Sequence, residues 1–339
     1  MEGNITDRLG YIDVAKGIGI LCVMLGHFGI QAIDKVVFTF HMPLFFLISG
    51  YFINDNVSIW EFVKRKISRL LVPYYVTGVS ICFLLILADI VRGLWNQIPI
   101  DFWNIIIAIL YGSCLDVTKQ IHGIGAIWFL WALFWSTLMV RIFCKLKWRG
   151  AIWIWVLALA SYLTSLFIWL PLSIQQGGCA AIFVYFGWKL KQIDLKKYIK
   201  NIWLMLFAFG VFVLQILFDI RVDMAKNTYD LGVVSVLGAV IICFLVLCVS
   251  NIICSTRMPI ISRVLCFWGK YSLIMLCFHQ IEMRVFPWSI VTYILKSMEM
   301  TRWFNCVAIP IRIVLCTVCT GIFVYIMKRF KQKTRLLNA

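Results

Sequence analysis

Charged residues are scarce in this sequence. They make up 14% of its 339 residues, whereas hydrophobic residues make up 63% and the mean hydropathy is +0.93. A water-soluble domain carries about 25% charged residues, and a fold of this size cannot hide so much apolar surface in one core. The composition therefore argues against a soluble enzyme and predicts an all-α integral membrane protein, because the bilayer itself covers the apolar surface.

Long polar stretches are also missing. No segment between the apolar runs is long enough to form a soluble domain, and neither an internal repeat nor a low-complexity linker divides the chain. We therefore expect one transmembrane domain over residues 1–339 and no soluble domain. The first apolar run is not followed by a small-residue cleavage site, so we interpret it as a retained helix and not as a signal peptide.

Acidic residues are fewer than basic ones, 15 against 32, which gives a net charge of +17. In a soluble protein such an excess indicates nucleic-acid binding. Here the basic residues form short clusters between apolar runs, as the positive-inside rule describes for cytoplasmic loops, and some can attract anionic lipid headgroups. We expect membrane lipids, and no nucleic acid, as partners.

Metal-binding patterns are absent as well. Most of the 13 cysteines fall inside apolar runs, where cysteine behaves as a small hydrophobic residue. No CxxC pair has a nearby histidine at zinc spacing. We expect unpaired packing cysteines and no metal.

Ten apolar runs are long enough to cross a bilayer as helices, which requires about 20 residues each. They are residues 10–30, 36–53, 70–91, 124–142, 150–170, 172–190, 201–219, 231–250, 264–281 and 304–327. With ten spans and a cytoplasmic N-terminus, the inner segments hold 21 Lys and Arg residues and the outer segments hold eight. We therefore predict a multi-pass protein of the cell inner (plasma) membrane with both termini in the cytoplasm. Residues 101–113 are too short to span and are expected in the outer interface or dipping part-way into the membrane.

The first apolar run contains an unusual set of ionisable residues, Asp13, Lys16 and His27. Such groups are costly at membrane depth, so each is a candidate functional residue. On one continuous helix Lys16 and His27 share a face about 16 Å apart along the axis, and Asp13 can pair with Lys16. We interpret the three as a candidate catalytic set, with Lys16 near the cytoplasmic mouth. The alternative is an interfacial ion pair and a buried histidine whose hydrogen bonds are satisfied.

All four histidines fall on the outer half in this topology, namely His27, His41, His122 and His279. Histidine is the most common general base near neutral pH. Glu282 follows His279 by three residues and can orient its ring, although an exposed loop pair fits the spacing equally well. This clustering favours a site on the outer half of the protein.

A small polar step, Ser49 and Gly50, interrupts the second run and is followed by the basic cluster KRKISR (64–69). Arg65, Lys66 and Arg69 in this cluster can bind phosphates. Enforcing membrane topology is the competing explanation and accounts for most of the cluster.

Five motifs occur in order along the chain. They are LGYIDVAKGIGILCVMLGH (9–27), FHMPLFFLISGYF (40–52), RKISRLLVPY (65–74), IWFLWALF (127–134) and GKYSLIMLCFH (269–279). Together they resemble the acyltransferase 3 family of membrane O-acyltransferases, in particular its fucose 4-O-acetylase-like branch. The first two motifs are specific in combination and the other three are weaker. The resemblance covers most of the chain.

The resemblance implies an enzyme that moves an acyl group, usually acetyl, from cytosolic acetyl-CoA to a hydroxyl of a glycan or lipid-linked sugar acceptor. It places the family's essential histidine on His27 and its arginine on Lys16, a departure because lysine keeps the charge but loses the bidentate fork. We expect His27 to act as general base or to relay the acyl group covalently. Lys16, Arg65 and Arg69 are expected to hold the CoA phosphates.

The remaining candidate residues are expected to line the substrate chamber: His41, Ser49, Tyr51, Trp128, His279 and Glu282. Two other functions stay open. One is an exporter or transporter, against which the lack of an inverted repeat argues, and the other is a succinyltransferase of the same family. The sequence does not identify the acceptor or the oligomeric state.

Overall fold

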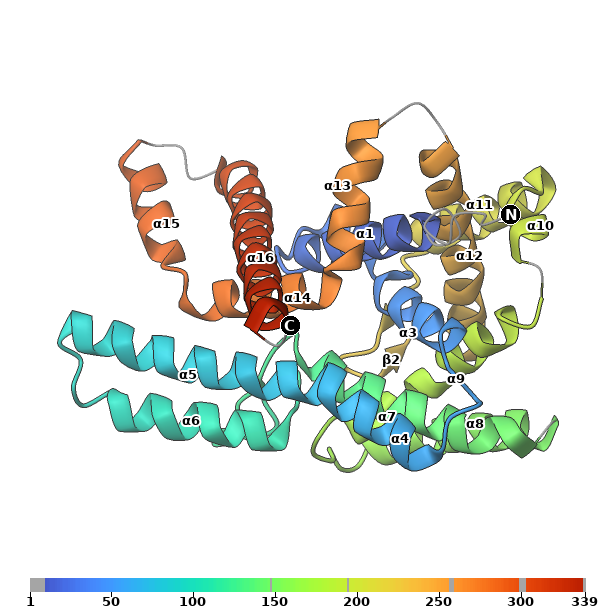
Figure 1. Ribbon diagram of the computed structural model, residues 1–339, viewed down its shortest axis with the longest axis horizontal. Helices are drawn as coiled ribbons and strands as arrows, with labels where there is room; N and C mark the ends of the chain where they lie inside the picture. Colours follow the sequence, from blue (N-terminus) through green and yellow to red (C-terminus); the bar gives the residue numbers. More distant parts are fainter. Residues whose placement is uncertain (1–9, 147, 194, 256–258, 299–302, 338–339) are drawn as a thin grey trace.

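The computed structural model describes residues 10–146, 148–193, 195–255, 259–298 and 303–337, which form a largely helical structure (Figure 1). In chain order the elements are α1 (Gly10–Leu25), α2 (Gln31–Val37), α3 (His41–Tyr51), α4 (Ile59–Lys66), the π-helical turn η1 (Ile67–Leu71), α5 (Val72–Arg92), α6 (Ile98–Tyr111), α7 (Trp128–Phe143), the 3-10 turn η2 (Cys144–Leu146), α8 (Trp148–Ser165), α9 (Ile174–Leu190), α10 (Leu195–Ile199), α11 (Ile202–Leu217), β1 (Val222–Asp223), β2 (Thr228–Tyr229), α12 (Val233–Ser255), α13 (Pro259–Lys270), α14 (Ser272–Val285), α15 (Trp288–Ser297) and α16 (Phe304–Leu337). The predicted helical class is confirmed, with one addition. A two-residue antiparallel hairpin pairs β1 with β2 and also attaches to the main body, since the Val222 amide donates to the Phe38 carbonyl.

Glycines allow two pairs of helices to cross with their backbones in contact. Where α1 crosses α13, a Cβ built on Gly17 would lie 2.2 Å from the Leu265 carbonyl oxygen. Where α3 crosses α9, a Cβ on Gly187 would lie 1.8 Å from the Leu47 carbonyl oxygen. Small residues at such crossings are typical of helix packing in membranes, where van der Waals contact takes over from the hydrophobic effect.

In the part of the chain that the structure describes, five helical stretches are long and apolar enough to cross a membrane, and the bent pair α13–α14 makes a sixth. The five are Gln31–Tyr51, Ile59–Arg92, Trp128–Leu146, Val233–Ser255 and Phe304–Gln332, and the two helices of the bent pair meet at 78°. Each of the ten predicted runs contains a helix. However, α1, α8, α9 and α11 are only 16, 18, 17 and 16 residues long. The structure thus supports five or six spans by length and composition. The count of ten and the cytoplasmic termini stay predictions, and the chain ends 1–9 and 338–339 lie outside the described residues.

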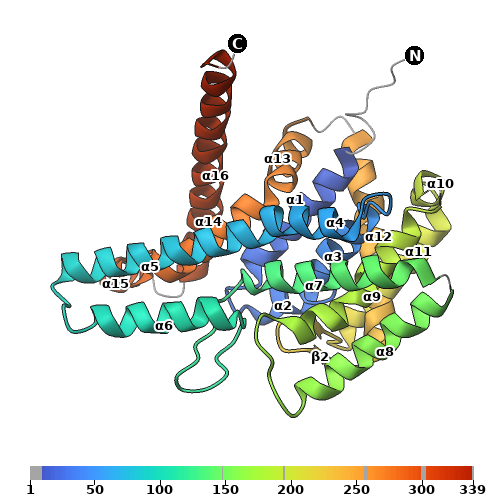
Figure 2. The same ribbon diagram turned by 60° about the horizontal axis from the view of Figure 1, so that its bottom comes forward.

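The short run at 101–113 forms most of α6, which folds back alongside α5 (Figure 2). Tyr74, near the start of α5, donates its hydroxyl to the Ile109 carbonyl, near the end of α6, at 2.7 Å. The helix ends at Gly112, whose φ of 66° is the left-handed conformation that terminates helices. With 14 residues α6 is about 21 Å long, less than the roughly 30 Å of a bilayer core. Its length therefore agrees with the prediction that this run does not span.

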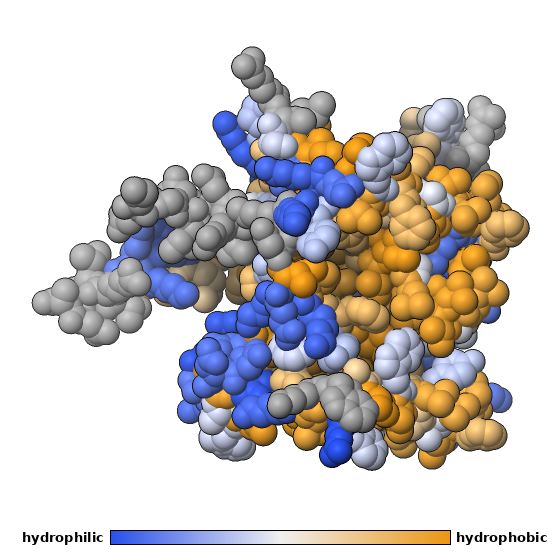
Figure 3. Space-filling view, turned by 90° about the vertical axis from the view of Figure 1, so that its right-hand side faces the viewer, coloured by the Kyte–Doolittle hydropathy of each residue, from blue (hydrophilic) through white to orange (hydrophobic). Residues whose placement is uncertain are grey.

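Apolar side chains cover much of the outer surface. The face seen in Figure 3 is mostly hydrophobic, with hydrophilic residues gathered along part of one edge. On α11 only Ala208 and Gln215 are buried, whereas Trp203, Phe207 and Leu217 are 77%, 61% and 71% exposed. A soluble protein rarely exposes contiguous apolar area of this kind. We therefore expect lipid to cover this surface.

Candidate active site

A cavity of about 430 Å³ lies between α1, α3, α4, η1, α7 and α14. Its volume falls in the range of roughly 300–1,000 Å³ that is usual for ligand pockets. The lining is mostly apolar and aromatic, with a few polar groups. It consists of Lys16, Ile20, Val23, Met42, Phe45, Ile48, Ser49, Phe52, Asn54, Val57, Phe62, Arg65, Lys66, Arg69, Leu70, Ala126, Trp128, Phe129, Leu130, Leu133, Ser272, Leu273 and Leu276.

Four cations gather in the lining. Lys16 comes from α1, Arg65 and Lys66 come from α4, and Arg69 comes from η1. The spacing i, i+1 and i+4 puts the three residues of the basic cluster on one side of their helix. The segment begins with Ser58 as N-cap, whose hydroxyl accepts a hydrogen bond from the Glu61 amide at 3.2 Å, and it continues directly into the π turn. The basic loop expected from sequence is thus a helix that presents its charges to the cavity.

Two of these cations carry carboxylate partners and are held by them. Lys16 Nζ lies 2.7 Å from Asp13 Oδ1, the i,i+3 pair expected from sequence, and Arg65 is paired with Glu61. Within the described residues Arg69 has no carboxylate within ion-pair distance. The cavity therefore keeps a net positive charge, which suits an anionic ligand.

Two helix faces lead from the cations toward a pair of histidines. Along α1 the lining residues Lys16, Ile20 and Val23 follow one stripe at i, i+4 and i+7. Val23 is four residues before His27, and Leu276 on α14 is three residues before His279. Neither histidine lines the cavity, but each follows the last lining residue of its helix within four residues along the chain.

The imidazole rings of His27 and His279 face each other. Their centroids are 5.1 Å apart and their planes are tilted by 47°. The prediction that one continuous helix carries Asp13, Lys16 and His27 is wrong in its last residue, since α1 ends at Leu25 and His27 lies in the following turn. Gly29, with a φ of 63°, reverses the chain there. His27 is exposed, whereas His279 is completely buried.

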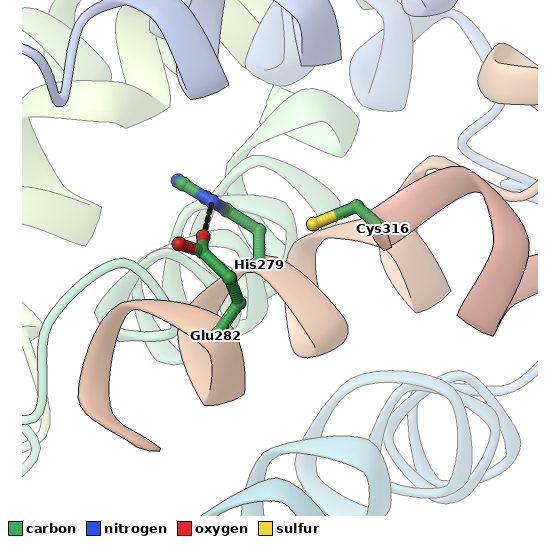
Figure 4. Close-up of side chains that lie close together, drawn as sticks. All are labelled: His279, Glu282 and Cys316. Atoms are coloured by element: carbon green, nitrogen blue, oxygen red, sulfur yellow. Dashed lines mark hydrogen bonds and ion pairs between the residues drawn. The ribbon is translucent and has the colours of Figure 1, made fainter. Parts of the chain in front are cut away.

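Buried polar contacts orient the His279 ring through its Nδ1, beginning with Glu282 (Figure 4). Its Nδ1 lies 3.2 Å from Glu282 Oε2, so Glu282 does orient this ring as the spacing allowed, and the pair is buried rather than in an exposed loop. Glu282 also accepts from Trp288 Nε1 at 2.7 Å and lies 3.0 Å from Arg312 Nε. With Nδ1–H donated to the carboxylate, the unprotonated nitrogen is Nε2, which is buried and has no hydrogen-bond partner among the described residues.

The distances among His279, Glu282 and Cys316 would also permit a metal ion, since their ligand atoms lie within 4.8 Å of one another. The Arg312 guanidinium next to Glu282 opposes this, because it already satisfies the carboxylate and would repel a second cation. The chemistry of this donor set fits a hydrogen-bonded relay better than a metal site, and the expectation of no metal stays a prediction.

Gln280, the neighbour of His279, ties α14 to the segment before α7. Its side chain accepts from the Ala126 amide at 2.6 Å and donates to the Ile124 carbonyl at 2.8 Å. Because Ala126 lines the cavity, this double contact fixes the cavity wall next to the histidine pair.

The other predicted chamber residues divide into two groups. Ser49 and Trp128 line the cavity, whereas His41 and Tyr51 do not. His41 is buried at the start of α3 and donates Nδ1–H to the Val37 carbonyl at 2.6 Å. Tyr51 packs against Leu190, Leu195 and Leu247 on another side of α3. Residues two positions apart on a helix point about 200° away from each other around its axis, so Ser49 and Tyr51 cannot share one face.

Two residues of the site were not anticipated from sequence, Arg312 and Gln280. Arg312 had an available signal, because it is a charged residue inside the apolar run 304–327 and such residues are functional candidates by default. Gln280 had none, since a neutral amide next to a histidine is unremarkable in a sequence.

Comparison of the sequence with known proteins identifies its family. Residues 9–327 match the acyltransferase 3 family, described as an acyltransferase domain. The chain is 28% identical over 157 residues to the nodulation protein NolL of Mesorhizobium japonicum, a match that covers 42% of this chain and 37% of that protein. It is 26% identical over 154 residues to the nodulation protein NolL of Sinorhizobium fredii, covering 39% and 35% respectively.

The chain thus spans little more than a third of the length of the curated relatives that it matches. No solved structure matches it significantly. The family match, by contrast, includes every residue of the cavity lining, both histidines, Glu282 and Arg312. It confirms the family expected from the five motifs: the chain belongs to the acyltransferase 3 family and carries an acyltransferase domain over nearly its whole length.

Proposed function

We propose that the protein is a membrane-embedded O-acyltransferase that moves an acyl group, in the first instance acetyl, from cytosolic acyl-CoA to a hydroxyl of a cell-surface glycan or lipid-linked sugar. It acts in the plasma membrane, with ten spans and both termini in the cytoplasm. Within the family we assign it to the fucose 4-O-acetylase-like branch, on the strength of its first two motifs.

One observation carries this proposal. The cavity has four cations in its lining, and the last lining residues of α1 and α14, Val23 and Leu276, precede a pair of neighbouring imidazoles by four and three residues. Acyl-CoA has the matching shape, with charged phosphates at one end and a thioester at the end of a flexible, largely neutral arm.

The cations have distinct uses toward such a ligand. Arg69 offers a planar fork with no internal partner among the described carboxylates, and a guanidinium binds phosphate oxygens in a bidentate way. Lys16 supplies a point charge, held toward the cavity by Asp13. The apolar and aromatic wall between these charges and the histidines, which includes Trp128 and Phe129, suits the pantetheine arm.

The transfer itself needs a group that handles the hydroxyl proton. The acceptor oxygen forms a bond to the thioester carbonyl carbon, the carbon–sulfur bond breaks, and the hydroxyl proton ends on the CoA thiol. His27 serves either as the base that takes this proton or as the carrier of the acyl group between the two substrates. Because His27 is in the exposed class, a large acceptor can reach it.

The test is CoA release by the purified protein in lipid nanodiscs. With acetyl-CoA the protein is expected to release free CoA thiol, and His27→Ala is expected to lower that rate by at least 10²-fold while thermal unfolding stays unchanged. A parallel reaction with succinyl-CoA identifies the preferred donor. Retained CoA release in a folded His27→Ala protein, or binding of acetyl-CoA without release by the unmodified protein, would refute the assignment.

A further inference from the structure

His27 and His279 are placed in very different surroundings although their rings face each other. The His279 ring is completely buried and is fixed by Glu282, which is itself fixed by Trp288 and Arg312. His27 is in the exposed class, and within the described residues no carboxylate lies within ion-pair distance of its ring. A carboxylate that accepts from Nδ1 fixes the tautomer of an imidazole and stabilises its protonated form. Both effects favour a role as general base. Histidine can also form a covalent acyl intermediate, and His27, which lacks a described carboxylate partner, is left for that role.

From this asymmetry we infer that His279 is the catalytic base that takes the proton of the acceptor hydroxyl, and that His27 carries the acyl group. The inference deepens the proposed function and rests on it. It assigns one nitrogen to the proton, the buried and unpartnered Nε2 of His279. Glu282 and Arg312 are positioning residues that act through His279.

The two half-reactions balance as follows. In the first, a His27 nitrogen attacks the thioester carbonyl carbon, the carbon–sulfur bond breaks, and the proton on the other imidazole nitrogen ends on the CoA thiolate. In the second, His279 Nε2 takes the proton of the acceptor hydroxyl, and the oxygen attacks the acyl carbon. The carbon–nitrogen bond to His27 then breaks, and the proton passes from His279 to His27, so both rings return to their neutral forms.

Arg312 fits this assignment because it fixes the charge of the carboxylate. Its guanidinium stacks on Phe28, the residue after His27, at 4.1 Å from the ring centroid, and it bonds Glu282 on the other side. Arg312 therefore connects the turn that carries His27 to the residue that orients His279. An ionised Glu282 accepts hydrogen bonds only, which keeps His279 Nδ1 in the donor role and leaves Nε2 free for the acceptor.

The experiment is a single-turnover reaction with radiolabelled acetyl-CoA on the full chain in nanodiscs, with water as the probe acceptor. His279→Asn keeps a donor for Glu282 but has no basic nitrogen. It is expected to release about one CoA per protein, to retain the label on His27, and to discharge it about 10²-fold or more slowly than the unmodified protein. His27→Asn is expected to give neither CoA release nor label. His122→Asn, at an exposed loop histidine outside the site, serves as the matched control and is expected to turn over normally.

Two results would overturn the inference. One is turnover by His279→Asn within about twofold of the unmodified rate. The other is loss of the CoA burst in His279→Asn when acetyl-CoA still binds. Failure of the proposed function looks different, because the unmodified protein would then release no CoA at all.

Glu282 needs a variant that does not leave Arg312 buried and unpaired. The double substitution Glu282→Gln with Arg312→Met removes both charges together, so the fold is expected to survive. A positioning role predicts an intact CoA burst with slow discharge of the label in this variant. A burst and a discharge that are both unchanged would remove Glu282 and Arg312 from the mechanism.

Discussion

The rings of His27 and His279 lie 5.1 Å apart although they come from opposite ends of the chain, one from the turn after α1 and the other from the middle of α14. The two helices that carry them also supply two walls of the cavity, through Lys16, Ile20 and Val23 on one side and Ser272, Leu273 and Leu276 on the other. Neither imidazole lines the cavity, so the proposed function requires the acyl end of the ligand to extend beyond Val23 and Leu276 to reach them.

Arg69 is expected to contribute to acyl-CoA affinity more than its exposed position implies. It lines the cavity without a described carboxylate partner, so Arg69→Gln should remove a charge-assisted contact of about 1.5–3 kcal/mol. This corresponds to a rise of roughly 10–100-fold in the KM for acetyl-CoA, with little change in kcat. Lys64→Gln changes a neighbouring cation of the same cluster that does not line the cavity, and it should leave the KM unchanged. Equal KM values for Arg69→Gln and the unmodified protein would exclude a phosphate contact.

Lys16 tests whether a point charge suffices where the family resemblance places arginine. Lys16→Gln should raise the KM for acetyl-CoA about tenfold and leave Asp13 without its partner, whereas Lys16→Arg should stay within a few-fold. The measurement is steady-state kinetics of the two variants side by side. If both variants lose activity alike, the site depends on lysine geometry and not on charge.

Arg141 does not line the cavity, but we expect it to stabilise part of the cavity wall. The structure buries this charged side chain, and its Nη2 donates to the carbonyls of Asp55 and Val57 at 2.9 and 2.6 Å. Val57 lines the cavity, so this contact fixes part of the wall. Arg141→Leu leaves two carbonyls without their donor, at a cost of about 1–3 kcal/mol each, and should lower the unfolding temperature and raise the KM for acetyl-CoA.

The exposed Lys145, one turn further along, provides the control for Arg141. Lys145→Leu should change neither quantity. A stable Arg141→Leu protein with an unchanged KM would show that this loop does not shape the cavity.

Gly187 is expected to be required for the crossing of α3 and α9. An added Cβ would meet the Leu47 carbonyl oxygen at 1.8 Å, so Gly187→Ala forces the helices apart, and overpacking of this kind typically costs about 1–3 kcal/mol. Gly210 on α11 has no atom within 4 Å of the same position. Gly210→Ala should therefore stabilise the protein by up to about 1 kcal/mol through helix propensity. Thermal unfolding of both variants in nanodiscs checks the contrast, and equal shifts would contradict the close crossing.

The sequence predicted those features that depend on composition and on spacing along one helix. The helical class, the Asp13–Lys16 pair and the approach of Glu282 to His279 follow from local periodicity, and the structure contains all three. The end of α1 was misplaced because the apolar run continues past Leu25, and hydrophobicity alone does not register the reversal at Gly29.

Features that depend on which helices meet could not be predicted. Nothing local relates His27 to His279, or Arg312 on α16 to Glu282 on α14. The separation of Tyr51 from Ser49 was predictable in principle from the helical period. Both residues belong to the same family motif, but the motif does not distinguish the face of the helix that carries Ser49 from the face that carries Tyr51.

The most direct test of the central claim, that one cavity joins the CoA phosphates to the histidine pair, is the structure of the protein with acetyl-CoA bound to the His27→Asn variant. We expect phosphate oxygens within hydrogen-bond distance of Lys16 and Arg69, and the thioester carbonyl between the substituted side chain at position 27 and His279. CoA bound elsewhere on the molecule, or bound in the cavity with its thioester directed away from His279, would contradict it.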